Sequence, residues 1–248
     1  MSEKHFIEQK RYAESYLIPY LERHVPGFRG RRVLEVGCAE AGFLAALTGL
    51  GMRPAGLELE SSRVDLSRTL HPGLDLTVGD ITDPSVGRHF KAPFGVVVLR
   101  DVLEHVTDRK AALRNLRDLM EPGGYLYVTF PPRFSPFAGH HQNGRSLLRF
   151  WPWLHLLPAS WIQSLGRMLG EYPHITQNAV LNFRIGLSIR AFERLIRDAG
   201  FHPVVRELFL FRPVYALRFG IPARHAWNLP VLREFWTFGC ECLLARSD

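Results

Sequence analysis

The segment that most constrains the fold of this chain is an apolar run that ends near an acid and passes through small residues into a helical pattern. Val33–Val36 has the apolar character of a buried strand, and Glu35 lies near its end. Apolar residues recur at helical spacing from Phe43 onward. The small residues between them are Gly37, Cys38, Ala39, Ala41 and Gly42. Because such a turn lets backbone N–H groups approach a ligand at a helix N-terminus, the segment predicts a cofactor-binding turn in an α/β fold.

Two classes of cofactor use a turn of this kind. A dinucleotide site requires Gly-x-Gly-x-x-Gly, and the residues Gly37-x-Ala39-x-x-Gly42 match this pattern in part. S-adenosylmethionine carries an amino-acid end and a sulfonium, so an acid at the end of the strand suits its positive groups. Glu35, two residues before Gly37, therefore favours S-adenosylmethionine.

Acids also follow where later strands are predicted to end. Arg53–Glu58 is predicted as a second strand, and Glu58 lies about twenty residues past the turn, where a ribose-binding carboxylate belongs. Leu74–Val78 alternates like a strand and leads to Asp80, and Phe94–Leu99 is apolar enough to be buried on both faces. Strands that alternate with helices at these intervals predict a mostly parallel sheet with helices on both faces.

These motifs resemble those of the class I S-adenosylmethionine-dependent methyltransferases. The turn is similar to their first motif, acid-x-Gly-x-Gly-x-Gly, and Asp80-Ile81 resembles the third motif, whose acid lies beside the adenine. The run Arg100–Val106 closely resembles the segment after strand four in the subgroup that includes the ubiquinone-biosynthesis O-methyltransferases. The cofactor-binding residues implied by the resemblance are Glu35, Gly37, Cys38, Ala39, Gly42, Glu58, Leu59, Asp80, Ile81 and Arg100.

The resemblance also implies a fold. It is a Rossmann-like, doubly wound sheet of seven mostly parallel strands, with a final antiparallel hairpin and an insertion after strand five. Ala39 and Ala41 stand at two glycine positions of the first motif, and alanine is strained wherever φ is positive. We expect the backbone to adopt the family's turn there with both methyl groups tolerated.

The length of 248 residues predicts a single domain, residues 1–248, around one sizeable core. We divide it into an N-terminal helical segment (1–30), a cofactor-binding core (31–130), a substrate or lid insertion (131–187), and a C-terminal part with a helix and the last two strands (188–248).

Residues 1–130 hold 17 basic and 17 acidic residues, whereas residues 131–248 hold 14 and 7. The basic half would suit a nucleic acid, an anionic lipid surface or an anionic substrate, although arginine-rich usage from genome composition explains it equally well.

Histidines after the fifth predicted strand are candidates for a general base. His140 or His141 could take the proton from an acceptor hydroxyl as its oxygen attacks the methyl carbon, because imidazole has a suitable pKa. The alternative is that both contact solvent or cap the following turn. His105 competes for the same role, although it could instead fix the turn after the fourth strand by hydrogen bonding.

A metal site is a further hypothesis for the same region. Asp101-x-x-Glu104-His105 resembles an acid-x-x-Glu-His segment that binds a divalent cation in some methyltransferases, and His140 or His141 could complete the shell. Because the Glu-His pair also occurs in relatives with no known metal, we expect no divalent cation to be required.

The segment 147–169 is apolar and aromatic. Pro152 and Pro158 argue against a membrane-spanning helix, and an amphipathic helix after Pro158 is the better interpretation. Such a helix could pack on the core, cover a hydrophobic pocket or lie on a bilayer, where its tryptophans and arginines would favour the headgroup region. In each case we expect a bulky, partly apolar acceptor.

The remaining features concern location and function. Cys38, Cys240 and Cys242 form no disulfide framework and no zinc-binding spacing, and residues 2–5 are unlike a signal peptide, so we expect a cytoplasmic protein that could contact the inner face of the membrane. The expected activity is methyl transfer from S-adenosylmethionine to an oxygen or nitrogen of a small molecule, with no DNA partner. Alternatives are an RNA methyltransferase, a non-catalytic S-adenosylmethionine-binding protein and a Rossmann oxidoreductase.

Overall fold

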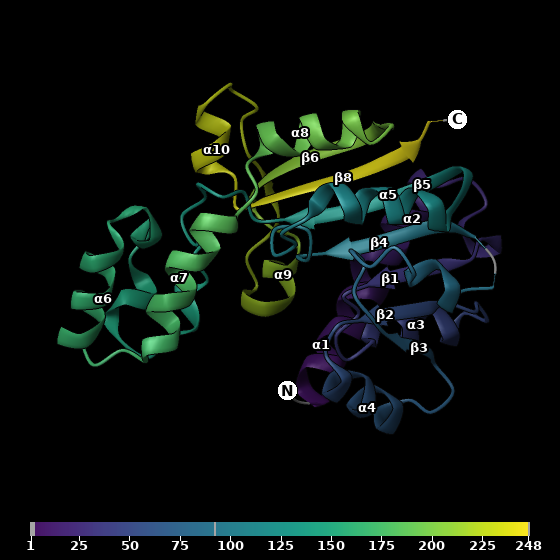
Figure 1. Ribbon diagram of the computed structural model, residues 1–248, viewed down its shortest axis with the longest axis horizontal. Coiled ribbons are helices and arrows are strands. Elements are labelled where there is room, and N and C mark those ends of the chain that lie inside the picture. The colour runs from purple at the N-terminus through teal and green to yellow at the C-terminus, as the bar shows by residue number, and fades with distance from the viewer. Residues whose placement is uncertain (1–2, 92, 248) are drawn as a thin grey trace.

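A single mixed sheet forms the centre of the molecule (Figure 1). The computed structural model describes residues 3–91 and 93–247. The strands are β1 (Val33–Val36), β2 (Ala55–Glu58), β3 (Asp75–Val78), β4 (Phe94–Arg100), β5 (Met120–Phe130), β6 (Phe201–Phe211), β7 (Arg224–His225) and β8 (Gly239–Arg246). They lie in the order β3-β2-β1-β4-β5-β8-β6-β7. Strands β1 to β5 pair in parallel, and β8 pairs antiparallel with both β5 and β6.

This topology confirms the predicted Rossmann-like α/β fold with a mostly parallel sheet. The antiparallel pairing of β6 with β8 is the expected final hairpin. The described residues form eight strands rather than seven, because two residues of the connection after β6 pair with it as β7 at the edge of the sheet.

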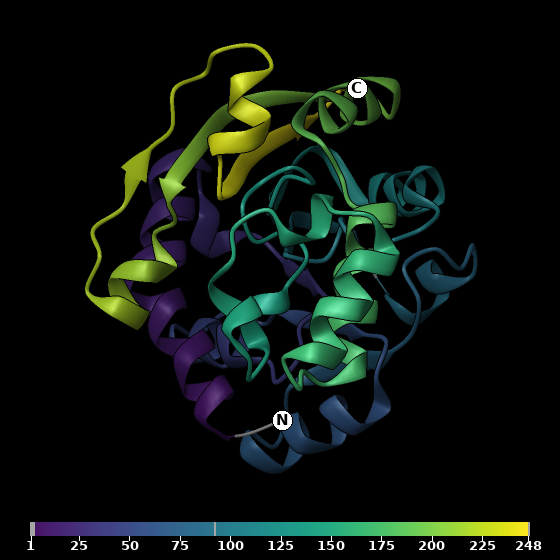
Figure 2. The ribbon, with the colours of Figure 1, turned by 90° about the vertical axis from the view of Figure 1, so that its left-hand side faces the viewer.

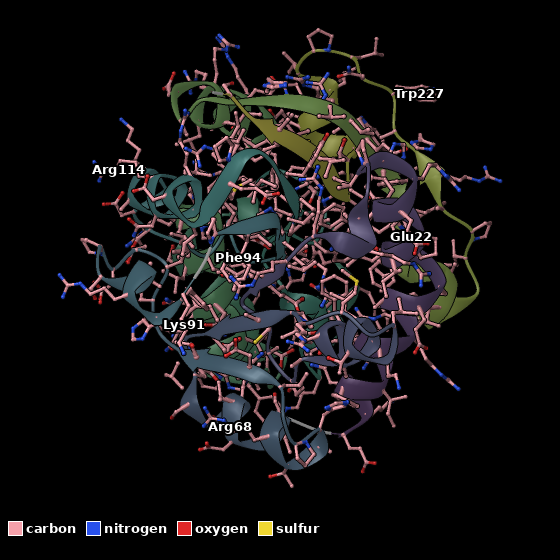
Figure 3. The ribbon with its side chains drawn as sticks, turned by 90° about the vertical axis from the view of Figure 1, so that its right-hand side faces the viewer. Glu22, Arg68, Lys91, Phe94, Arg114 and Trp227 are labelled. Atoms are coloured by element: carbon pink, nitrogen blue, oxygen red, sulfur yellow. The ribbon has the colours of Figure 1, made fainter. Side chains whose placement is uncertain are left out.

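Helices cover both faces of the sheet, as the strand pattern predicts. One face carries α2 (Ile18–His24), α3 (Gly42–Gly49) and α4 (Ser61–Leu70), and the other carries α5 (Arg109–Leu119) and α8 (Ile189–Asp198). Adjacent residues of β1 divide between the two cores: Val33 packs on the first face and Leu34 on the second, as the two-residue period of a strand requires. Phe94 is fully buried at the start of β4 and lies inside the molecule in Figure 3.

The N-terminal segment is helical. It consists of α1 (Glu3–Tyr12), the π-helical turn η1 (Ala13–Leu17) and α2. Helix α1 packs against α3. Short 3-10 turns at Phe28–Gly30 (η2) and Val86–His89 (η3) complete this half of the chain.

Between β5 and α8 the chain leaves the sheet and forms a lobe that stands apart from it in Figures 1 and 2. The lobe contains the 3-10 turns η4 (His141–Asn143), η5 (Leu147–Phe150) and η6 (Leu154–Leu156) and the helices α6 (Ala159–Met168) and α7 (Pro173–Ile185). The buried Glu171 carboxylate accepts hydrogen bonds from the backbone N–H groups of Arg145, Ser146 and Tyr172. These bonds tie the start of the lobe to the turn between its two helices.

The expected amphipathic helix is α6, but its apolar positions divide between two environments. Ile162 is buried against the rest of the lobe, whereas Trp161 and Met168 are 62% and 73% exposed. Among the described residues, no helix is both long and apolar enough to cross a membrane.

Several elements differ from the sequence-based expectation. The connection after β6 contains two short helices, α9 (Val214–Phe219) and α10 (Leu232–Trp236), for which no helix was predicted. Strand β5 begins early, at Met120, which pairs with Phe94 before an irregularity in the ladder. Helix α7 was also not predicted.

A buried carboxyl group lies between the sheet and the N-terminal helices. Glu241 on β8 is 3% exposed, and its Oε1 accepts a hydrogen bond of 2.8 Å from the Tyr16 hydroxyl. Burial, together with the charge of Glu207, raises the pKa of Glu241 to about 7, although the Tyr16 hydrogen bond opposes this shift. The folded protein therefore retains a proton that the unfolded chain releases at lower pH.

We predict that Glu241 makes the protein less stable as the pH rises. Because the pKa of a carboxyl is raised in the folded state, its contribution is full below the unfolded pKa of 4.5 and is lost as the pH rises through about 7. The loss amounts to about 3 kcal/mol at most. Urea unfolding of wild type and Glu241→Gln at several pH values measures it. Since other groups titrate equally in both proteins, the gain of the variant over wild type should grow between about pH 5 and pH 8. A gain that does not change with pH would contradict the assignment.

Candidate active site

A cavity of about 1360 Å³ opens where the parallel strands end. Residues that follow β1, β2, β3, β4 and β5 all line it, together with side chains from α1 and from the α9 region. The carboxyl ends of parallel strands are where α/β folds bind their ligands. The predicted cofactor residues and the predicted bases thus belong to one cavity.

The turn after β1 begins this cavity. Gly37, Ala39 and Ala41 have φ values of 70°, 50° and 61°. A Cβ at position 37 would overlap the Val102 side chain, so glycine is required there for both backbone and space. A left-handed backbone conformation costs an alanine about 1–2 kcal/mol, and the packing of the surrounding fold offsets this cost at Ala39 and Ala41. Both glycine positions of the motif thus have the positive φ that glycine favours.

Glu58 connects this turn to the end of β2. Its Oε2 accepts a hydrogen bond of 2.8 Å from the Ala39 N–H, and its Oε1 accepts one of 3.1 Å from the Glu60 N–H. The carboxylate lines the cavity, and each oxygen keeps a further acceptor site for a ligand hydroxyl. Leu59, Asp80 and Ile81 line the same end of the cavity.

Glu35 and Arg100 form a buried ion pair between the ends of β1 and β4. The guanidinium Nη2 and Nε of Arg100 lie 2.5 and 2.9 Å from Glu35 Oε1. Burial raises the pKa of Glu35, and Arg100 opposes this shift. Arg100 lines the cavity while Glu35 lies behind it, so Arg100 stands between this acid and the space for the cofactor.

Cys38 and Gly42 also lie behind the lining of the cavity. Cys38 is completely buried in the core, where burial raises the pKa of its thiol. The Gly42 N–H donates a 3.1 Å hydrogen bond to Oε1 of Gln9, and a Cβ on Gly42 would overlap α1. Gly42 therefore permits the close packing of α1 on α3.

Helix α1 closes one side of the cavity. His5 Nδ1 lies 2.5 Å from Glu40 Oε2, and Glu8 pairs with Arg218 in α9. His5, Glu8, Gln9 and Tyr12 all line the cavity. The apolar spacing of α1 did not predict this placement, because the polar face of the helix lines the cavity.

A second ion pair involves a residue that the sequence did not single out. Nη2 of Arg212, just after β6, donates to both carboxylate oxygens of Asp101 at 2.8 and 2.9 Å, and the Thr129 hydroxyl donates to Oδ1. Burial favours the neutral acid, but these partners outweigh it and lower the pKa of Asp101. The signal that could have identified Arg212 is its place at the end of a predicted strand.

Glu104, His105 and His140 meet on the other side of the cavity. Each offers a possible ligand atom, and these atoms lie within 4.8 Å of one another. Both oxygens of the buried Glu104 carboxyl lack a hydrogen-bond partner among the described residues, and burial raises its pKa well above the ordinary value. Asp101, the further acid expected in a metal site, is instead bound to Arg212.

The two adjacent candidate bases differ in position. His140 lines the cavity, and its ring centroid lies 5.3 Å from that of His105. Burial and the neighbouring His105 lower the pKa of His140 to about 4. His141 is completely buried outside the lining, where its Nε2 lies 2.8 Å from the carbonyl oxygen of Trp151. The structure therefore brings His105 and His140, but not His141, to the site.

Known proteins share this architecture. A methyltransferase-domain family model matches residues 9–205. Among curated relatives, a ubiquinone biosynthesis O-methyltransferase of Proteus mirabilis is 26% identical over 112 residues, which are 44% of this chain and 46% of that protein. The matching segment thus spans about half the length of such relatives.

Solved structures agree in fold. An S-adenosylmethionine-dependent methyltransferase of Mesorhizobium loti superposes with a TM-score of 0.61 at 14% identity, covering 94% of this chain and 100% of the other. One from Thermotoga maritima gives 0.57 at 15% identity, covering 98% and 94%. The chain therefore belongs to the methyltransferase-domain family, with the class I fold and with S-adenosylmethionine as its cofactor.

Proposed function

We propose that the chain transfers the methyl group of S-adenosylmethionine to an oxygen of a bulky, partly apolar small molecule. The observation that carries this proposal is one cavity with two chemically different sides. Glu58, Leu59, Asp80 and Ile81 supply the polar and apolar contacts expected for a nucleoside. His105 follows β4 and His140 follows β5, on the other side of β1 from those residues, and we place the acceptor beside them.

Transfer proceeds by in-line displacement in this proposal. The acceptor oxygen attacks the methyl carbon, the carbon–sulfur bond breaks, and its electron pair stays on sulfur to give S-adenosylhomocysteine. The acceptor proton passes to an imidazole nitrogen of His140. Because positioning in line supplies much of the rate enhancement, a base as weak as His140 suffices.

The cavity is large, and its lining is rich in aromatic side chains beside the arginines Arg149, Arg212 and Arg218. The aromatic side chains that line it are Tyr12, Phe137, Phe150, Phe211, Tyr215, Phe219 and Phe238. The volume of about 1360 Å³ exceeds the upper end of ordinary ligand pockets, about 1,000 Å³, so it has room for a cofactor and a bulky acceptor together. The curated relatives are named as O-methyltransferases, and this supports oxygen over nitrogen as the atom that is methylated.

The other expectations remain alternatives. An RNA methyltransferase would use the basic C-terminal half, but the aromatic lining favours a small apolar acceptor over a polyanion. A non-catalytic S-adenosylmethionine-binding protein would need no base beside the methyl group. A cytoplasmic location stays a prediction.

The histidine cluster offers donors that a divalent cation accepts, since Glu104 has two unpartnered oxygens beside two imidazoles. A bound cation there would lower the pKa of an acceptor hydroxyl. The proposal omits it, because Asp101, the further acid expected in such a site, is held by Arg212, which leaves Glu104 as the one acid of the cluster.

We predict that Glu58→Gln weakens S-adenosylmethionine binding by about 10- to 100-fold, since charge-assisted hydrogen bonds contribute about 1.5–3 kcal/mol. Isothermal titration calorimetry measures the change. Glu22→Gln is the matched control, because Glu22 lies outside the cavity lining and is labelled on the exterior in Figure 3. Equal affinities of Glu58→Gln and wild type would contradict the role of Glu58.

We predict that His140→Gln lowers kcat by about 100-fold, the lower end for general base catalysis, and leaves cofactor affinity unchanged. Since the pKa of His140 is about 4, the wild-type rate should stay level from about pH 8 to about pH 5 and fall only below that. His174→Gln, in an exposed position on α7, serves as the control. A midpoint near the ordinary histidine pKa of 6.5 would point to another base.

We predict that exhaustive chelation leaves turnover unchanged. The reason is that Arg212 holds Asp101, so that Glu104 is the one acid beside the imidazoles of His105 and His140. Activity is measured after dialysis against a chelator and again after Mg²⁺ or Mn²⁺ is restored. Loss of activity that either ion rescues would contradict the metal-free proposal.

A further inference from the structure

Large apolar side chains are unevenly distributed over the surface. Among the described residues, 21 such side chains are exposed, and 16 of them lie in two segments, 147–181 and 217–236. In the first segment they are Leu147, Phe150, Trp151, Trp161, Met168, Leu169, Tyr172 and Leu181. In the second they are Leu217, Phe219, Ile221, Trp227, Leu229, Val231, Leu232 and Trp236. We call these side chains the aromatic surface.

The two segments are neighbours in space. The rings of Trp153 and Trp236 lie 6.0 Å apart, edge to face, which joins the lobe to α10. Phe150 and Phe219, 64% and 66% exposed, line the same cavity from opposite segments. Both segments lie on the side that faces the viewer in Figure 2, where the parallel strands end. The mouth of the cavity therefore opens within the aromatic surface.

Five of the seven charged residues of these segments are arginines. The first contains Arg149 and Arg167 and the second contains Arg218, Arg224 and Arg233. Each contains one acid, and neither carboxylate is free. Glu171 is bound by backbone N–H groups within the lobe, and Glu234 accepts from the N–H groups of Ile189 and Arg190 at the start of α8. Arg218 and Arg233 are paired with Glu8 and Glu193, which lie outside the two segments, whereas Arg149, Arg167 and Arg224 have no acidic partner among the described residues. These three arginines make the aromatic surface complementary to an anionic partner.

The tryptophans point to the kind of partner. All five of the chain, Trp151, Trp153, Trp161, Trp227 and Trp236, lie in these two segments. Tryptophan with arginine is typical of surfaces that insert into the headgroup region of a bilayer, where the ring is half in hydrocarbon and the cation meets lipid phosphate.

We propose that the aromatic surface docks the protein on an anionic phospholipid bilayer, with the mouth of the cavity facing the lipid. Helix α6 then serves as a membrane contact rather than a lid, which agrees with its absence from the lining of the cavity. The delivery of an apolar acceptor from the bilayer rests on the function proposed above, whereas the docking does not.

The test is co-sedimentation of the full chain with vesicles of phosphatidylcholine alone or mixed equally with phosphatidylglycerol, at low and at high salt. We expect binding to the anionic vesicles, weakened by salt. Tryptophan fluorescence with brominated lipid gives a second readout that reports on these two segments alone, because they contain all five tryptophans of the chain.

The test variant is Trp161→Ala with Trp227→Ala. These side chains are 62% and 84% exposed and lie outside the cavity lining, so their loss should leave folding intact. We expect binding to fall about tenfold, which corresponds to about 1.4 kcal/mol. Leu50→Ala with Val204→Ala, exposed outside the surface, is the matched control.

The charge variant is Arg224→Gln, with the exposed Arg114→Gln as its control; Arg114 and Trp227 lie at opposite edges of the molecule in Figure 3. Arg224→Gln should weaken binding at low salt, and Arg114→Gln should not.

Absence of pelleting with anionic vesicles at low salt would overturn the proposal. Equal binding of the double tryptophan variant and wild type would also overturn it. The assay contains neither cofactor nor acceptor. A failure here therefore leaves the proposed methyl transfer standing, and a failure to bind S-adenosylmethionine leaves the docking standing.

Discussion

The buried ion pair of Glu35 with Arg100 is the interaction on which the site depends most. It joins the ends of β1 and β4, the two strands between which the order of the sheet reverses. Glu35 is fully buried and the Arg100 side chain is 14% exposed, and removing one partner of such a pair costs about 3–5 kcal/mol because the other charge is left uncompensated. The pair therefore fixes the point where the cofactor turn and the acceptor side of the cavity meet.

Several residues around this ion pair have strained backbone conformations. Ala39, Ala41, Asp101 and His140 all have positive φ, and three of these four line the cavity. Asp101 is held in this conformation by Arg212 and Thr129, and Ala39 by the hydrogen bond from its N–H to Glu58. Strained backbone at positions that contact ligands is typical of functional sites.

Much of the fold could be predicted because local patterns determine it. Apolar runs identified β1, β2 and β4, and the acids Glu35 and Glu58 mark the ends of the first two. The turn glycines and Glu58 were found by their spacing along the chain. Pairings between distant segments were not, because Arg212 meets Asp101 across 111 residues and Gln9 meets Gly42 across 33. Sequence spacing carries no information on such contacts.

The lobe between β5 and α8 also shows a limit of prediction from the sequence. Its spacing predicted one apolar face on α6, but packing in the lobe buries Ile162 and leaves Trp161 outside. The helices α9 and α10 lie in a stretch rich in proline and arginine, where short helices have weak signals, although both border the cavity or the aromatic surface. The shape of the acceptor side of the cavity therefore could not be predicted from the sequence, whereas the residues of the cofactor side were predicted from the motifs.

The central claim is that this cavity binds S-adenosylmethionine. Calorimetric titration of the full chain with S-adenosylmethionine, and in parallel with NAD⁺, tests it most directly. The account predicts saturable heat with S-adenosylmethionine at one site per chain and none with NAD⁺. Heat with NAD⁺ alone, or with neither ligand at high protein concentration, would contradict it.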